Sequence, residues 1–72
     1  MITMNKVASY RKHKRLSQKQ LASLVGVHPS YIALIELGLR KPSLDIALKL
    51  SRILGVPVEE LFPVEEDAGD RE

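Results

Sequence analysis

Two short stretches of helical periodicity, separated by a single glycine, dominate the middle of this 72-residue sequence. In the first stretch Leu21, Ala22 and Val25 recur at the spacing of one apolar helix face. Ser17 precedes them and is a good N-cap, since its hydroxyl can accept a hydrogen bond from a free amide of the first turn. Gly26 follows, where helices commonly end in a left-handed residue. The pattern predicts a helix of about two turns that ends abruptly.

The second stretch begins at His28-Pro29 and is closed by Gly38. Proline suits the first turn of a helix, because its missing N–H would have no partner there. Ile32 and Ile35 give this helix an inward face. Two short helices held at an angle by a glycine turn form a helix-turn-helix, a motif that places its second helix in the major groove of DNA.

Further residues extend the pattern over nearly the whole chain. They are Ser17-Gln18, Leu21-Ala22, Gly26-Val27, Tyr31-Ile32, Ile35-Glu36, Gly38, Pro42-Ser43-Leu44-Asp45, Leu54-Gly55-Val56 and Glu59-Glu60-Leu61-Phe62. In this order and at these spacings, the sequence resembles the phage-repressor type of helix-turn-helix, the XRE or Cro/CI-like family. The resemblance covers residues 5–63.

The expected fold is all-α: a compact five-helix, repressor-like helix-turn-helix domain over residues 1–63. Its helices are predicted at residues 5–13, 18–25, 29–37, 44–54 and 58–62. In the fourth helix the residues expected to be buried are Leu44, Ala47, Leu48, Leu50 and Leu54. Residues 64–72 hold almost nothing apolar, so an acidic, disordered tail is expected there.

Charge is divided unevenly along the chain. Residues 1–54 hold ten Lys and Arg against two acids, a balance of +8, and residues 55–72 hold seven acids against one Arg, a balance of −6. A basic body favours a polyanionic partner such as double-stranded DNA. The alternative is that these cations only solvate helix surfaces.

Several function classes find no support in the composition. The chain has no cysteine, which excludes disulfides and thiolate chemistry, and its two histidines lack the companions of a metal site. No nucleophile–base set is evident, so neither an enzyme nor a cofactor is expected. Without a membrane-length apolar run or a signal peptide, we expect a cytoplasmic protein with no membrane partner.

The second helix of the motif is expected to contact bases through its N-terminal end and outer face. The candidates are His28, Pro29, Ser30, Ala33 and Leu34. Relatives often carry Arg, Gln, Ser or Lys at three of these positions. Here Ala33 and Leu34 could touch thymine methyl groups, and Ser30 and His28 could donate to a base or a phosphate. We therefore expect A/T-containing half-sites with a large contribution from DNA shape. For Leu34, a partly buried structural role is an equal alternative.

Phosphate contacts are expected from both sides of that helix. The candidates are Gln18, Tyr31, Arg40, Lys41 and Ser43. The resemblance implies that Gln18 binds a phosphate and also touches the start of the recognition helix. It implies a mixed role for Tyr31, with a packed ring and a hydroxyl near phosphate. Loop cations followed by a helix N-terminus form a natural backbone clamp. Plain surface roles remain the alternatives, as they do for three cations at the end of the first helix: Lys12, Lys14 and Arg15.

The resemblance implies two further features. Arg11 and Glu36 match a partly buried ion pair that braces the first helix against the third, which explains an acid within a DNA-binding motif. Repressor-type domains also bind as two-fold dimers. The candidates for a homodimer surface are Ile46, Ile53, Val58 and Phe62, which could equally be scattered exposed residues.

Together these features predict a transcriptional regulator, a repressor that binds double-stranded DNA sequence-specifically and acts by occupying an operator. The alternative is an antitoxin or another protein-interaction module. It would use the apolar outer face of residues 29–37 and the acidic tail to bind a protein partner.

Overall fold

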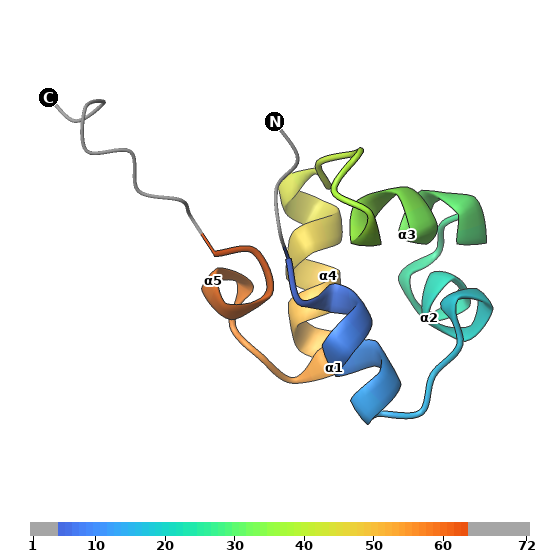
Figure 1. Ribbon diagram of the computed structural model, residues 1–72, viewed down its shortest axis with the longest axis horizontal. Helices are drawn as coiled ribbons and strands as arrows, with labels where there is room; N and C mark the ends of the chain where they lie inside the picture. Colours follow the sequence, from blue (N-terminus) through green and yellow to red (C-terminus); the bar gives the residue numbers. More distant parts are fainter. Residues whose placement is uncertain (1–4, 64–72) are drawn as a thin grey trace, which may run out of the picture.

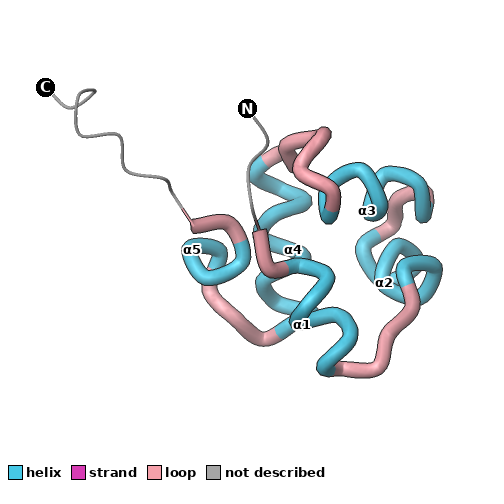
Figure 2. Tube along the Cα trace, in the orientation of Figure 1, coloured by secondary structure: helices cyan, strands magenta, loops and turns pink. Residues whose placement is uncertain are grey.

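Five α-helices make up the computed structural model, which describes residues 5–63 (Figure 1). They are α1 (Val7–His13), α2 (Gln18–Val25), α3 (Pro29–Glu36), α4 (Leu44–Leu54) and α5 (Val58–Leu61). Helices and loops account for all of residues 5–63, with no strand among them (Figure 2). The all-α, five-helix prediction is thus confirmed. The expected acidic tail lies outside the described residues.

α1 begins two residues later than expected because Asn5 stands outside the helix as a polar clamp. Its Oδ1 accepts a hydrogen bond from the Val7 amide (3.1 Å), and its Nδ2 donates to the Ile35 carbonyl in α3 (2.8 Å). The side chain therefore satisfies a free amide of the first turn and ties the start of the domain to α3.

α1 ends in a left-handed turn that is formed by an arginine. The Leu16 amide donates to the Arg11 carbonyl (3.1 Å) and the Arg15 amide to the Lys12 carbonyl (2.9 Å). These two bonds form a Schellman motif. One residue of this motif has a left-handed conformation, and that residue is usually glycine. Arg15 occupies it here, with φ +60°.

α2 begins and ends as its sequence predicts. The Ser17 hydroxyl oxygen accepts from the Gln20 amide (2.9 Å), and the Gln20 side chain accepts from the Ser17 amide (2.8 Å), forming a capping box. Gly26 ends the helix at φ +92°. Gly26 therefore sets the direction of the chain between α2 and α3, and glycine adopts this left-handed conformation with little strain.

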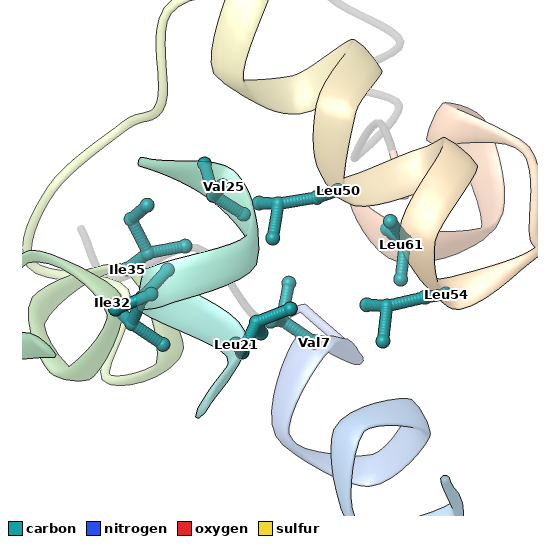
Figure 3. Packing of buried hydrophobic residues seen from close by; sticks show 9 residues of the cluster. Val7, Leu21, Val25, Ile32, Ile35, Leu50, Leu54 and Leu61 are labelled. Atoms are coloured by element: carbon teal, nitrogen blue, oxygen red, sulfur yellow. The ribbon is translucent and has the colours of Figure 1, made fainter. Parts of the chain in front are cut away.

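The core is a cluster of fully buried side chains contributed by all five helices (Figure 3). Its members are Val7, Leu21, Ala22, Val25, Ile32, Ile35, Leu50, Leu54 and Leu61. α2 packs against both α3 and α4, and in Figure 3 the side chains of Val25 and Leu50 point toward each other. Both inward contacts predicted for α3, Ile32 and Ile35, are buried in this cluster, and they leave its opposite side free.

The prediction for α4 was wrong at two positions. Leu44 and Leu48 are 73 % and 41 % exposed, whereas Ala47, Leu50 and Leu54 are buried. Each residue turns a helix by about 100°, so a face centred on the three buried residues directs Leu44 and Leu48 toward solvent. The side chains that flank the buried face are Ile46 and Ile53, both partly buried against the core.

α5 closes the core on the side remote from α3. It packs against α4, and α1 and α4 stand between it and α3 (Figure 1). A backbone hydrogen bond joins the Lys6 amide to the Leu61 carbonyl (2.9 Å), so the beginning and end of the described chain lie together.

Candidate nucleic-acid interface

Arg11 and Glu36 form a nearly buried ion pair between α1 and α3. Arg11 Nε lies 2.7 Å from Glu36 Oε2 and Nη2 lies 3.2 Å from Oε1, while Nη1 donates to the Leu16 carbonyl (2.8 Å). The two side chains are only 11 % and 7 % exposed. The acid of α3 is therefore turned away from the outer face and neutralised, which removes a charge that would repel DNA.

Gln18 joins this pair from α2. It was expected to touch the start of α3, whereas the bond is made to Glu36, the last residue of that helix. Its Nε2 donates to Glu36 Oε1 (2.9 Å). A side-chain amide carries two N–H donors, so a second donor remains while the first binds Glu36. The contact links the first residue of α2 to the ion pair, and through it to both neighbouring helices.

His28 and Ser30 meet at the N-terminus of α3. His28 is the N-cap: its Nδ1 accepts from the Ser30 amide (3.1 Å) and lies 2.9 Å from the Ser30 hydroxyl. With Nδ1 as the acceptor, Nε2 is the ring nitrogen left to donate. Both side chains are exposed, and His28 thus offers one N–H donor beside the start of the helix.

The outward side of α3 is apolar. Pro29 and Ala33 are partly exposed, Leu34 is 36 % exposed, and Leu37, at the end of the helix, is 62 % exposed. Pro29, Ala33 and Leu37 follow one another at intervals of four residues, and Leu34 lies three residues before Leu37, so the four positions border one broad face. The structure therefore brings the expected base-contacting residues together on an uncovered surface.

Tyr31 and Arg40, two of the expected phosphate contacts, stand against each other. The Arg40 guanidinium carbon lies 5.9 Å from the centroid of the Tyr31 ring, within the range of a cation–π contact. The ring itself packs against the core. This stacking holds an exposed cation of the loop after α3 close to the helix.

Lys41 and Ser43 follow in the same loop, and both are exposed. The Ser43 hydroxyl oxygen accepts from the Ile46 amide (3.2 Å) and caps α4. Its O–H remains available as a donor. Arg40, Lys41 and Ser43 thus occupy one segment between α3 and α4.

The acids of the described chain are paired or remote from α3. Residues 5–63 hold ten Lys and Arg against four acids, a balance of +6. Glu36 is bound by Arg11, and Asp45 lies 3.8 Å from Lys49 at the surface. Glu59 and Glu60 belong to α5, on the far side of the domain (Figure 1). The charged side chains of the loop that follows α3, Arg40 and Lys41, are both cations.

Glu60 instead contacts α1. It accepts a hydrogen bond from the Tyr10 hydroxyl (3.2 Å). This bond favours the protonated phenol and raises the pKa of Tyr10, with further contributions from desolvation and from the negative charge of Glu60.

The four candidates for a dimer surface are all partly buried: Ile46, Ile53, Val58 and Phe62. Ile46, Ile53 and Phe62 pack against the core. Leu44 and Leu48 are the more exposed apolar side chains of α4.

Within residues 5–63, no helix is long and apolar enough to cross a membrane, and no group of three or more His, Asp or Glu side chains could hold a metal ion.

Two short helices joined at a left-handed glycine, the second exposed and followed by a cationic loop, define a helix-turn-helix domain. The model of the helix-turn-helix family HTH_3 matches residues 7–61. The chain belongs to this family, as its resemblance to repressor-type sequences predicted.

Similar proteins are transcriptional regulators by name. An HTH-type transcriptional regulator of Methanocaldococcus jannaschii is 40% identical over 63 residues, which cover 88% of this chain and 96% of the relative. The crystal structure of the restriction-modification controller protein C.AhdI from Aeromonas hydrophila is 40% identical with a TM-score of 0.72, covering 79% of this chain and 86% of that one. Bacillus subtilis SinR, a master regulator of biofilm formation, was crystallised in complex with DNA. That structure is 38% identical with a TM-score of 0.69, covering 75% of this chain and 87% of the crystallised chain.

Proposed function

We propose that this chain binds double-stranded DNA sequence-specifically and regulates transcription as a repressor that occupies an operator. The observation that carries this proposal is the electrostatic setting of α3. The helix is exposed, its acid is bound by Arg11 and Gln18, and cations follow it in the loop. A surface of this kind matches the shape and charge of a major groove.

Contacts to bases and to the DNA backbone divide between two groups of residues. Bases are contacted from the N-terminus and outer face of α3, by His28, Pro29, Ser30, Ala33 and Leu34. Phosphates are contacted on either side, by Gln18, Tyr31, Arg40, Lys41 and Ser43. The second amide hydrogen of Gln18, the Tyr31 hydroxyl and the Ser43 hydroxyl are the donors that the internal hydrogen bonds leave available.

The DNA-bound form in this proposal is a homodimer. Two copies related by a two-fold axis would place their α3 helices in successive major grooves, about 34–36 Å apart. Ile46, Ile53, Val58 and Phe62 remain candidates for the interface. The exposure of Leu44 and Leu48 adds these two residues to that surface.

Selection of bound duplexes from a random pool tests the proposal. We expect an enriched, two-fold symmetric site whose two halves are one helical turn apart. The logarithm of the affinity should fall linearly with the logarithm of salt concentration, because bound phosphates release counterions. Failure to enrich any sequence at low salt would reject DNA recognition.

The protein-interaction alternative predicts the opposite salt response. Apolar contacts through α3 would persist as salt rises, since their strength depends on buried area. The regulators among the relatives favour the DNA-binding proposal over this alternative.

A further inference from the structure

The outer face of α3 lacks the groups with which proteins usually distinguish bases. Arg and Lys bind guanine through two hydrogen bonds, and Asn and Gln bind adenine in the same way. Residues 29–36 contain none of these four. The carboxylate of α3, Glu36, is occupied by Arg11 and Gln18. This helix can make no bidentate contact with a base.

What α3 does present is methyl-bearing apolar surface. Ala33, Leu34 and Leu37 lie on its outward side, and Leu34 and Leu37 are well exposed. Along the major groove, the base-edge group that matches such a surface is the C5-methyl of thymine. A methyl group at C5 of cytosine occupies the equivalent place on its own base pair and offers the same contact.

Hydrogen bonding by α3 is confined to its first turn. His28 directs Nδ1 to the Ser30 amide, which leaves its Nε2–H as a single donor. One donor can approach the N7 acceptor of either purine, so it discriminates weakly between them. The Ser30 hydroxyl, which lies 2.9 Å from the same Nδ1, adds one more single contact. Most of the discrimination must then come from the apolar part of the face.

Charge complementarity favours DNA as the occupant of this face. Arg40 is held beside α3 by its stacking on Tyr31, and Lys41 follows it. Glu59 and Glu60 lie beyond α1 and α4 (Figure 1). An apolar strip set among cations suits a groove whose walls are phosphates and whose floor carries methyl groups.

We propose that α3 recognises C5-methyl groups of pyrimidines through Ala33, Leu34 and Leu37, so that the sites it reads contain thymine, or 5-methylcytosine, at the contacted positions. This inference rests on the proposed DNA-binding function. It adds the chemical group that is read and the side chains that read it.

Deoxyuridine substitution tests the inference with the wild-type protein. In a duplex taken from the random-pool selection, each thymine is replaced in turn by deoxyuridine, which removes only the methyl group. We expect binding to weaken about four-fold at each contacted position, the change expected for one buried methyl-sized group. A cytosine·guanine pair at that position should bind about four-fold tighter when its cytosine is methylated.

Two variants assign the effect to α3. Leu34→Ala should abolish the deoxyuridine effect at one position of each half-site. Leu24→Ala, which removes an equally large exposed side chain from α2, should preserve it. Circular dichroism checks that both are folded, and the measurement on the wild type stands without them.

The possible failures are distinguishable. Tight, salt-dependent binding that ignores every thymine methyl would overturn the inference and leave DNA recognition intact. A second result would also overturn the inference: a Leu34→Ala variant that keeps the deoxyuridine effect but no longer self-associates in the absence of DNA. In that case Leu34 would belong to the dimer interface. Absence of any selected duplex would overturn the proposed function, and this inference with it.

Discussion

The guanidinium of Arg11 donates hydrogen bonds to both carboxylate oxygens of Glu36, with its Nε 2.7 Å from Oε2. The pair joins α1 to α3 at a site with little solvent, and Gln18 adds a bond from α2. Three helices thus converge on one carboxylate. The orientation of α3 relative to the rest of the domain depends on that convergence.

Replacement of Arg11 by Ala should therefore destabilise the domain severely. The Glu36 charge would be left nearly buried without its cation, at a cost of about 3–5 kcal/mol. Urea or thermal denaturation followed by circular dichroism measures the loss. The exposed neighbour Lys12→Ala serves as the control and should unfold close to the wild type.

A double replacement separates a stranded charge from lost packing. Arg11→Met combined with Glu36→Leu removes both charges and fills similar volumes, so it should be much more stable than Arg11→Ala. Equal melting of Arg11→Ala and the wild type would contradict the bracing role.

Arg15→Gly should stabilise the protein. Arg15 has φ +60° at the left-handed position of the motif that ends α1, a conformation that costs a side-chain-bearing residue about 1 kcal/mol. A gain of that size would raise the Tm by roughly 4–8 °C in a domain of this length. Arg15→Ala retains the Cβ and loses the same charge, so a comparable gain in that variant would attribute the effect to charge instead.

The pKa of Tyr10 should fall toward its ordinary value in Glu60→Gln, because the carboxylate that favours the protonated phenol is gone. Titration of phenolate absorbance in a Tyr31→Phe background reports Tyr10 alone. A raised folded-state pKa means that the unfolded chain loses this proton first. The stabilising contribution is therefore complete below the ordinary tyrosine pKa and lost as pH rises through the folded one. Glu60→Gln should show a smaller alkaline loss of stability than the wild type.

Arg40→Ala should weaken binding to the selected duplex without changing its sequence preference. A cation on a phosphate contributes about one unit to the slope of log affinity against log salt, so that slope should decrease by about one. Arg52→Ala removes the same side chain from the end of α4 that is remote from α3, and its slope should match that of the wild type (Figure 1). An unchanged slope in Arg40→Ala would remove Arg40 from the phosphate contacts.

Local signals were sufficient to predict α2 and the starts of α3, α4 and α5. Ser17, Gly26, Pro29 and Ser43 each act within a few residues of themselves, and the helices have the predicted starts. Ends that depend on distant groups were less predictable. α1 begins later than expected because the Asn5 side chain reaches Ile35, thirty residues away.

The burial of α4 shows the limit of periodicity. Leu44 and Leu48 share a face with each other, and both are exposed. Apolar side chains also occur on protein surfaces, so residue type alone does not identify the buried face of this helix. Only the packing of α4 against α1, α2 and α5 decides which side is covered. The Gln18–Glu36 bond was hidden for the same reason, since nothing in the sequence indicates how far apart the two helices lie.

The hydrogen bond between the Lys6 amide and the Leu61 carbonyl has a practical consequence for engineering. The described backbone ends beside α5, with α1 and α4 between that point and α3 (Figure 1). Its beginning also touches α3, because Asn5 donates to the Ile35 carbonyl. A reporter fused after residue 63 would therefore be attached on the side away from α3, whereas one fused before residue 5 would start next to that helix. Fluorescent or affinity tags are best added after residue 63, where they leave the recognition surface unobstructed.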